Sequence, residues 1–213
     1  MDLSNISLNT HSSIKITGKD GIVLYCDPYE ITEAAQDADL ILLTHDHYDH
    51  FDPKSVEKVM KADTAFIVPE SVQNSVSEVA GDRQVIPLKA GQRVLIDGVS
   101  IQAVAAYNLK KQYHPKAKGW LGYLITLDQR VYYIAGDTDA LPENTKFQVD
   151  VALVPIGGTF TMDAKEAADF VNALCPKAVI PVHYGTVAGK PEDADHFEAQ
   201  VNACIPVVRK LFV

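Results

Sequence analysis

Cysteine, tryptophan and long apolar runs are all scarce in this chain. Its 213 residues include 3 cysteines and 1 tryptophan. Cys26, Cys175 and Cys204 are far apart and odd in number, which excludes a disulfide framework and a Cys-x-x-Cys metal clip. No apolar run approaches the roughly 20 residues that span a bilayer, so we expect no membrane segment.

Positive charge is also in short supply. Lys and Arg number 19 against 28 Asp and Glu, which gives a formal net charge of -9. Nucleic-acid binding draws most of its affinity from the neutralisation of phosphates, so nucleic acid is not an expected partner. The first residues form no basic and apolar leader, and reduced thiols suit the cytosol. We therefore expect a cytoplasmic protein.

The remaining composition, 47% hydrophobic and 22% charged, is that of an ordinary globular protein. Hydrophobic periodicity predicts short strands and a few amphipathic helices. The strands are expected at 13–17, 22–26, 39–44, 65–68, 85–87, 93–96, 99–105, 123–127, 131–135, 151–154 and 178–182, and the helices at 53–62, 71–80, 163–174 and 191–203. Because no repeat or linker interrupts the pattern, we expect one domain over 1–213, with two packed sheets and helices outside.

The segment His45-Asp46-His47-Tyr48-Asp49-His50 directly follows the expected buried strand 39–44. Strand ends are where α/β folds place their sites. Imidazole and carboxylate suit zinc, iron or manganese, and no thiolate stands nearby to indicate a structural zinc cage. His45, His47, Asp49 and His50 offer more ligands than one tetrahedral ion easily collects from one loop. The segment therefore predicts two ions that share it.

Two later segments also place a polar residue just beyond an apolar strand. Asp137 follows Gly136, where a sharp turn would let its carboxylate bridge two cations; an ordinary Asx turn is the alternative. His183 ends the expected strand 178–182, although a lone histidine is more often structural than a ligand. In combination with the first segment, metal ligation is favoured for both.

With Thr10-His11-Ser12-Ser13 and Asp27-Pro28 at the front, the chain from about His11 to Thr186 resembles the metallo-β-lactamase superfamily. Its small lactonase-like and phospholipase-D-like hydrolases are the most similar branch. The resemblance implies an α/β fold, a four-layer αβ/βα sandwich of two mixed sheets with helices outside. It also implies zinc as cofactor, two ions in the cleft, with manganese, iron or nickel as alternatives.

The resemblance assigns roles residue by residue. His45 and His47 would bind the first ion, and Asp49, His50 and His183 the second. Asp137 would bridge both ions, and Asp27 would support the metal loop from behind the ligands, together with His11 and Asn108 in the same outer layer.

One departure concerns the first ion, which usually receives a third histidine from the middle of the chain. The corresponding stretch here is Ala105-Ala106-Tyr107-Asn108, and Asn is a weak zinc ligand. His114 or His11 would replace the missing ligand, or the first site binds its ion loosely. We favour His114.

Just after this middle stretch, four lysines fall within a segment of nine residues, at Lys110, Lys111, Lys116 and Lys118. A solvated loop is the ordinary interpretation, because lysine is usually exposed. The sharper hypothesis is that Lys110 and Lys116, with Tyr184, bind the anionic group of a small substrate.

The resemblance implies a hydrolase in which a metal-bound hydroxide attacks a small anionic ester, lactone or phosphodiester. Asp49 would orient or deprotonate the attacking water, and Asp137 would hold both ions. The sequence does not choose among His11, His114 and metal-bound water as the source of the proton for the leaving group. The alternatives are a nuclease of the same fold, a metal-binding domain without turnover and an iron-based oxygen chemistry. The substrate and the oligomeric state, a homo-oligomer included, are not fixed by the residues.

Overall fold

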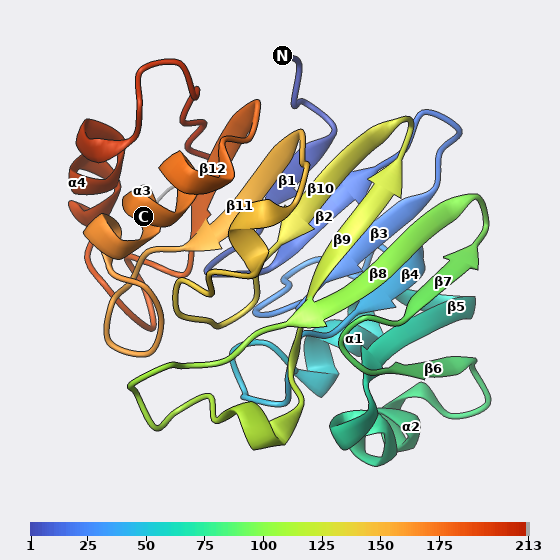
Figure 1. Cartoon of the computed structure of the whole chain (residues 1–213). Helices are drawn as coiled ribbons and strands as arrows, with labels where there is room; N and C mark the ends of the chain where they lie inside the picture. The colour runs from blue at the N-terminus through green and yellow to red at the C-terminus, as the bar shows by residue number, and fades with distance from the viewer. Residues whose placement is uncertain (212–213) are drawn as a thin grey trace.

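Two six-stranded sheets face each other in the computed structural model, which describes residues 1–211 (Figure 1). The first sheet runs in chain order, β1 (Ile6–Leu8), β2 (Ile14–Thr17), β3 (Val23–Cys26), β4 (Ala38–Leu42), β5 (Met60–Pro69) and β6 (Val85–Leu88). The second has the order β12 (Ala178–Val182), β11 (Val151–Pro155), β10 (Arg130–Ile134), β9 (Leu121–Leu127), β8 (Val99–Ala105) and β7 (Arg93–Ile96). Both are mixed: β3 to β6 and β10 to β12 pair in parallel, and the other pairs are antiparallel.

Helices cover the outer faces of both sheets. Side chains of α1 (Pro53–Val59) and α2 (Gln73–Ala80) pack on the first sheet, and those of α3 (Ala164–Leu174) and α4 (Asp193–Gln200) pack on the second. A third apolar cluster draws residues from both sheets and fills the space between them. The expected four-layer αβ/βα sandwich is thus confirmed. Short 3-10 turns lie at η1 (Glu70–Val72), η2 (Lys116–Lys118) and η3 (Asn144–Lys146). In the described part of the chain, no helix combines the length and apolarity needed to cross a bilayer.

Most predicted elements are present, and several differ in their bounds. The strand predicted at 65–68 extends over 60–69, and the helix predicted at 71–80 begins at Gln73 after a 3-10 turn. The predicted helix 53–62 ends at Val59, because Met60 turns extended and pairs with Ala38 of the neighbouring strand. The last helix covers only 193–200, since the backbone becomes extended at Val201. Strand β1 was not predicted, because three residues are too few to show an alternation. The helix predicted at 163–174 is present as α3, and a capping box of Asp163 and Glu166 marks its start.

The connections that follow β3, β4, β10 and β12 meet at one edge of the sandwich. There the two halves are joined by main-chain hydrogen bonds, from Leu121 N to Thr44 O (3.0 Å) and from His183 N to His11 O (3.1 Å). The long yellow-green connection between β8 and β9 projects below this edge in Figure 1. Polar residues at separate strand ends are therefore brought together.

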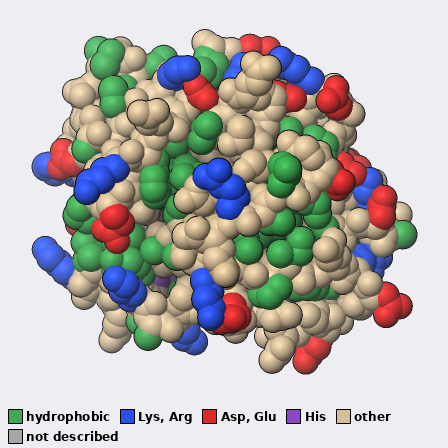
Figure 2. Space-filling view, turned by 45° about the vertical axis from the view of Figure 1, so that its right-hand side comes forward, with side chains coloured by type: hydrophobic (Ala, Val, Ile, Leu, Met, Phe, Trp, Pro, Cys, Tyr) green, Lys and Arg blue, Asp and Glu red, His purple; other side chains and the backbone are tan. Residues whose placement is uncertain are grey.

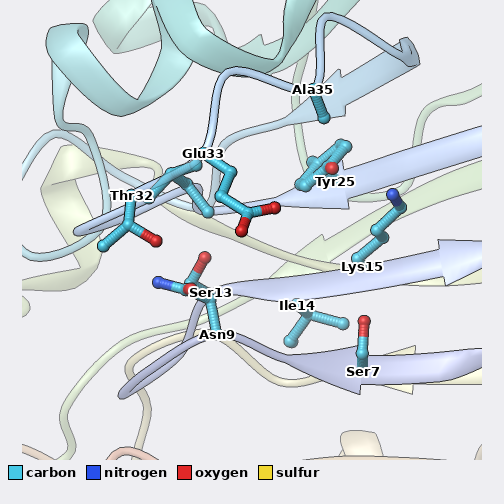
Figure 3. Close-up of a pocket in the computed structure, with 10 residues that line it drawn as sticks. Ser7, Asn9, Ser13, Ile14, Lys15, Tyr25, Thr32, Glu33 and Ala35 are labelled. Atoms are coloured by element: carbon cyan, nitrogen blue, oxygen red, sulfur yellow. The ribbon is translucent and has the colours of Figure 1, made fainter.

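A separate hollow of about 250 Å³ lies on the outer face of β2 and β3 (Figure 3). Lys15 and Tyr25, which are partners across these strands, line it. Both side chains donate hydrogen bonds to Asp37, from Lys15 Nζ (2.6 Å) and Tyr25 Oη (2.9 Å). Lys15 is the one cationic side chain among the described residues that line the hollow, and it is already paired with Asp37. We therefore interpret the hollow as a polar network at the surface.

Candidate metal centre

Six of the seven histidines converge at the edge where the two sheets meet. A first cluster consists of His45, His47 and His114, each offering a ring nitrogen within 4.8 Å of the others. His45 and His114 are buried and His47 is half-buried. The Trp120 ring packs against all three imidazoles, with centroid distances of 4.9, 4.8 and 5.5 Å. An aromatic wall therefore fixes one side of this cluster.

Asn108 stands behind His114 rather than beside the other two histidines. Its Oδ1 accepts a hydrogen bond from the backbone N–H of His114 (3.0 Å) and lies 3.2 Å from the ring Nδ1. Its Nδ2 donates to Asp139 Oδ1 (3.1 Å) and to the Phe160 carbonyl (3.0 Å). This anchoring turns His114 Nε2 inward, so the structure brings His114 and not Asn108 to the position of the third histidine.

A second cluster brings together His11, Asp49, His50 and His183, all buried. His11 Nε2 lies 3.2 Å from Asp49 Oδ2, and its other nitrogen, Nδ1, lies 3.2 Å from Thr186 Oγ1. His11 was one alternative for the third ligand of the first ion. The structure instead places it in the second cluster, with Asp49, His50 and His183. His11 lies on the β1–β2 connection, and its backbone carbonyl accepts a hydrogen bond from the backbone N–H of His183 across the sheet edge. This bond keeps His11 beside the second cluster.

Asp137 lies between the two clusters. Its Oδ2 is 3.2 Å from His114 Nε2 and 3.0 Å from His183 Nε2, and its Oδ1 is 3.2 Å from His50 Nε2. The preceding Gly136 has φ +65, and a Cβ there would lie 2.8 Å from the Leu121 carbonyl oxygen. Glycine is thus required for the turn that aims Asp137 into the centre.

Asp27 holds the metal loop from behind. It accepts hydrogen bonds from Thr44 N (2.8 Å) and Thr44 Oγ1 (2.6 Å), and its Oδ2 lies 2.7 Å from His50 Nδ1. A carboxylate on the outer nitrogen fixes the tautomer and ring orientation of an imidazole. His50 therefore presents Nε2 to Asp137.

Backbone strain accompanies this arrangement. His11, Asp27 and His183 have φ values of 50, 50 and 58, in the left-handed region that non-glycine residues seldom adopt. Such strain persists only where the surrounding structure enforces it, and it concentrates at functional sites. Six other described non-glycine residues, outside the centre, also have positive φ, so strain does not mark the site by itself. At His11, Asp27 and His183 it turns a side chain toward the clusters or their support.

Burial and mutual charge shift the protonation of these groups. Burial lowers the pKa of His45 well below its usual value and that of His11 to about 4. Burial would raise the pKa of Asp137, but the charges of His183 and His50 outweigh it and hold that pKa well below the usual range. For Asp49 the hydrogen bond to His11 likewise overcomes burial, and its pKa falls to about 2. Burial would lower the pKa of His50, but the charges of Asp137 and Asp27 outweigh it and raise that pKa well above the usual value. A divalent cation requires ionised carboxylates and neutral imidazoles, so its binding at this centre would release the proton of His50.

The residues pass a direct test of fit to a metal. Among the described residues, five buried side-chain atoms have no hydrogen-bond partner, and all five belong to this centre: His50 Nε2, His114 Nε2, Asp137 Oδ1 and both ring nitrogens of His183. Buried polar atoms are nearly always paired, and leaving one unpaired costs roughly 1–3 kcal/mol. Four of these five atoms, all except His183 Nδ1, meet at the Asp137 carboxylate, where the three ring nitrogens lie 3.0–3.2 Å from its oxygens. Ligand atoms on either side of a bridging carboxylate would be gathered in this way.

A pocket of about 280 Å³ opens onto both clusters. Its lining comprises His47, Tyr48, Asp49, Tyr113, His114, Asp137, Phe160 and Val187. On the face drawn in Figure 2, histidine surface is visible only as a small area in a recess, with hydrophobic and Lys or Arg side chains around it. The histidines are thus reached from solvent through a narrow opening.

Three residues predicted to bind substrate lie outside this lining. Lys110 is exposed, and Lys116 lines another hollow, where its ammonium lies 4.8 Å from the centroid of the Tyr107 ring. Tyr184 is buried in the apolar cluster beneath α3 and α4. A substrate contact by any of the three stays a prediction, and the structure does not bring them to the pocket.

Sequence reasoning missed several residues that shape the centre, namely Thr44, Trp120, Phe160, Thr186 and Val187. Thr44 was open to prediction, since it directly precedes the metal loop. The others lie on three separate connections, β8–β9, β11–α3 and β12–α4, and carry no metal-ligating group. Only the folded chain places them here.

Comparison with known proteins agrees with this geometry. A model of the β-lactamase superfamily domain matches residues 5–183. A UPF0173 metal-dependent hydrolase of Thermococcus kodakarensis is 32% identical over 210 residues, which cover 93% of this chain and 92% of that protein. A crystal structure from Parabacteroides distasonis shares 31% identity at a TM-score of 0.80, covering 97% of this chain and 93% of the other.

The fold alone is shared more widely. CmlA, a diiron β-hydroxylase of Streptomyces venezuelae, superposes with a TM-score of 0.77 at 13% identity, covering 97% of this chain and 52% of CmlA. Fold similarity at that identity carries neither metal nor reaction. By the match of the domain model and the identity to full-length relatives, the chain belongs to the β-lactamase superfamily and, within it, to the UPF0173 family of metal-dependent hydrolases.

Proposed function

We propose that this protein is a two-zinc hydrolase that cleaves a small ester, lactone or phosphodiester. The observation that carries the proposal is the set of buried, unpaired ring nitrogens and carboxylate oxygen gathered around Asp137. Imidazole and carboxylate ligands without a thiolate fit zinc, and manganese, iron or nickel are the alternatives.

The two clusters divide the ions between them. His45, His47 and His114 would hold one ion, and Asp49, His50 and His183 the other, with Asp137 contributing to both. His11 lies within reach of the second ion as a further donor. A bound divalent ion would supply a nucleophile at neutral pH, because it lowers the pKa of a coordinated water from 15.7 to roughly 7.

The chain's own residues would orient the attacking water and the metal ligands. Asp49 opens onto the pocket, and its Oδ2 is held by His11 Nε2 at 3.2 Å. Since the pKa of Asp49 is lowered to about 2, the carboxylate is ionised at neutral pH and able to accept a hydrogen bond from the attacking water. Asp27 and Asn108 keep His50 and His114 aimed inward, so that both clusters are assembled before substrate arrives.

The reacting group of the substrate would face the base of the pocket. An anionic group, such as the phosphoryl of a diester, is the expected choice there, because two cations would neutralise it. The net charge of -9 opposes a polyanionic nucleic acid. At about 280 Å³ the pocket lies at the lower limit of small-molecule sites, which favours a small substrate.

The test combines metal analysis with turnover. Purified protein should contain two equivalents of zinc and hydrolyse members of a panel of lactones, esters and phosphodiesters. Asp137→Asn should lose both ions and reduce turnover by at least a thousandfold, while Asp82→Asn, an exposed carboxylate at the end of α2, should change neither. Metal-free protein, or turnover that survives Asp137→Asn, would contradict the proposal. If the protein contains iron and its activity requires oxygen, the reaction is an oxidation and the proposed hydrolysis is wrong.

A further inference from the structure

The wall of the pocket differs in character from its base. The base is made of imidazoles and carboxylates, whereas Tyr48, Tyr113, Phe160 and Val187 form the wall and rim. Tyr113 packs edge-on against Phe160, with ring centroids 4.8 Å apart and planes at 86°. The four side chains come from four separate connections, yet they meet around one opening.

Two members of this wall are unusually exposed for their size. Tyr48 is 66% and Tyr113 41% exposed, and both are among the few large hydrophobic residues at the surface of the described chain. Single exposed apolar residues are common, but a group gathered at the mouth of a polar cavity indicates a binding surface.

Lys and Arg side chains lie around the opening in Figure 2, but the lining of the pocket itself carries no positive charge of this kind. None of the eight described residues that line the pocket is Lys or Arg. The nearby Lys111 has its ammonium 2.8 Å from Asp139 Oδ1 and 3.6 Å from Glu166 Oε2, so its charge is compensated within the protein. A second anionic group that stayed within the lining of the pocket would meet no Lys or Arg side chain.

From this division we propose that the substrate is amphiphilic, with its reacting ester or phosphoryl group at the metal clusters and an apolar alkyl or aryl substituent against Tyr48, Tyr113, Phe160 and Val187. This proposal rests on the proposed function and narrows its substrate class. The aromatic wall would exclude sugar phosphates, whose hydroxyl groups would lose water there without finding partners.

The experiment measures binding rather than turnover. Methyl-, butyl- and hexylphosphonate are titrated calorimetrically into the zinc-loaded protein, with glycerol 1-phosphate as the polar comparison. Affinity should rise about three- to fourfold for each methylene group that the wall covers. Glycerol 1-phosphate should bind no more tightly than methylphosphonate.

Substitutions then assign the gain to the wall. Tyr113→Ala and Phe160→Ala should flatten the dependence on chain length while leaving the affinity for methylphosphonate unchanged. Tyr48→Ser tests the same idea at a side chain too exposed to matter for folding. Leu109→Ala is the matched control, because Leu109 is a similarly exposed apolar residue (54%) on the same connection but outside the pocket.

Equal affinity for all three phosphonates, no binding by any of them, or an equal loss in the Leu109→Ala control would overturn the proposal. Its failure is distinguishable from that of the proposed function. A chain-length-dependent affinity without hydrolysis of any ester would remove the enzyme and keep the apolar wall. Hydrolysis at a rate that does not depend on the length of the substrate's alkyl chain would keep the enzyme and remove the apolar wall.

Discussion

Asn108 holds His114 by two contacts, accepting a hydrogen bond from its backbone N–H at 3.0 Å and lying 3.2 Å from its ring Nδ1. The asparagine that stands where the family places a histidine is thus the residue that orients a histidine six positions later. His114 therefore completes the first cluster in place of a histidine at position 108, and Asn108 supports it from behind.

Removing this support should weaken the first metal site without deleting a ligand. We expect Asn108→Ala to lower the affinity for one of the two zinc ions about 10- to 100-fold, the usual effect of losing a partner behind a ligating imidazole. Competition with a chromophoric chelator measures both affinities. Asn74→Ala, at an exposed position of α2, is the control. An unchanged affinity in Asn108→Ala would show that His114 needs no anchor.

Metal removal should destabilise the fold, because it leaves buried carboxylates and imidazoles facing one another. At a free zinc concentration a thousand times the Kd, binding adds about 4 kcal/mol to the free energy of unfolding. In a chain of this length, that corresponds to a fall in Tm of roughly 10 °C on chelation. Differential scanning calorimetry with EDTA, and again after zinc is restored, checks the effect. The same Tm in both states would count against a buried metal centre.

Gly136→Ala should disturb the turn that positions Asp137. A Cβ would approach the Leu121 carbonyl oxygen to 2.8 Å at a left-handed φ of +65. Gly98→Ala is a matched control, because Gly98 also has a positive φ (+78) but has open space around the added Cβ. Backbone strain alone costs about 1 kcal/mol, and the clash should add at least as much again in Gly136→Ala. Urea unfolding of both variants measures the difference, and equal losses would mean that the carbonyl moves aside.

Acid should weaken the network in the hollow of Figure 3 through Asp37. Burial raises the pKa of Asp37, but the hydrogen bonds from Lys15 and Tyr25 outweigh burial and lower it below 3.8. A lowered folded pKa contributes stability that is complete above the unfolded pKa of about 3.9 and is lost as the pH falls through the folded value. Asp37→Ala should therefore cost about 0.5 kcal/mol at neutral pH, a small effect because the pair is partly solvated.

This cost should shrink as the pH falls below the unfolded pKa of about 3.9 and disappear once the pH has fallen through the lower folded pKa of Asp37. Unfolding in urea at several pH values follows the difference between wild type and variant, with Asp82→Ala as the exposed reference. A difference that grows in acid would have the wrong sign and would exclude the proposed role of Asp37.

The sequence by itself determined the elements and the chemistry that act over short distances. Period-two alternation is visible in the strand predicted at 13–17, and short apolar runs mark strands that are buried throughout, such as β3, β11 and β12. Local residue pairs also fit the structure: Asp97-Gly98 and Asp128-Gln129 occupy turns with positive φ, and Asp163 with Glu166 caps the start of α3. The dense run from His45 to His50 at a strand end indicated a metal centre, because ligands so close together need no knowledge of the fold.

Only the tertiary structure decided which distant residues complete that centre. His11 and His114 were both candidates for one vacant position, and the choice depended on the paths of the β1–β2 and β8–β9 connections across the sheet edge. The apolar wall was beyond prediction for the same reason, since Tyr48, Tyr113, Phe160 and Val187 share no local pattern. Periodicity reports which face of an element is buried, but the meeting of separate loops depends on how two sheets pack, and that is fixed by the whole core at once.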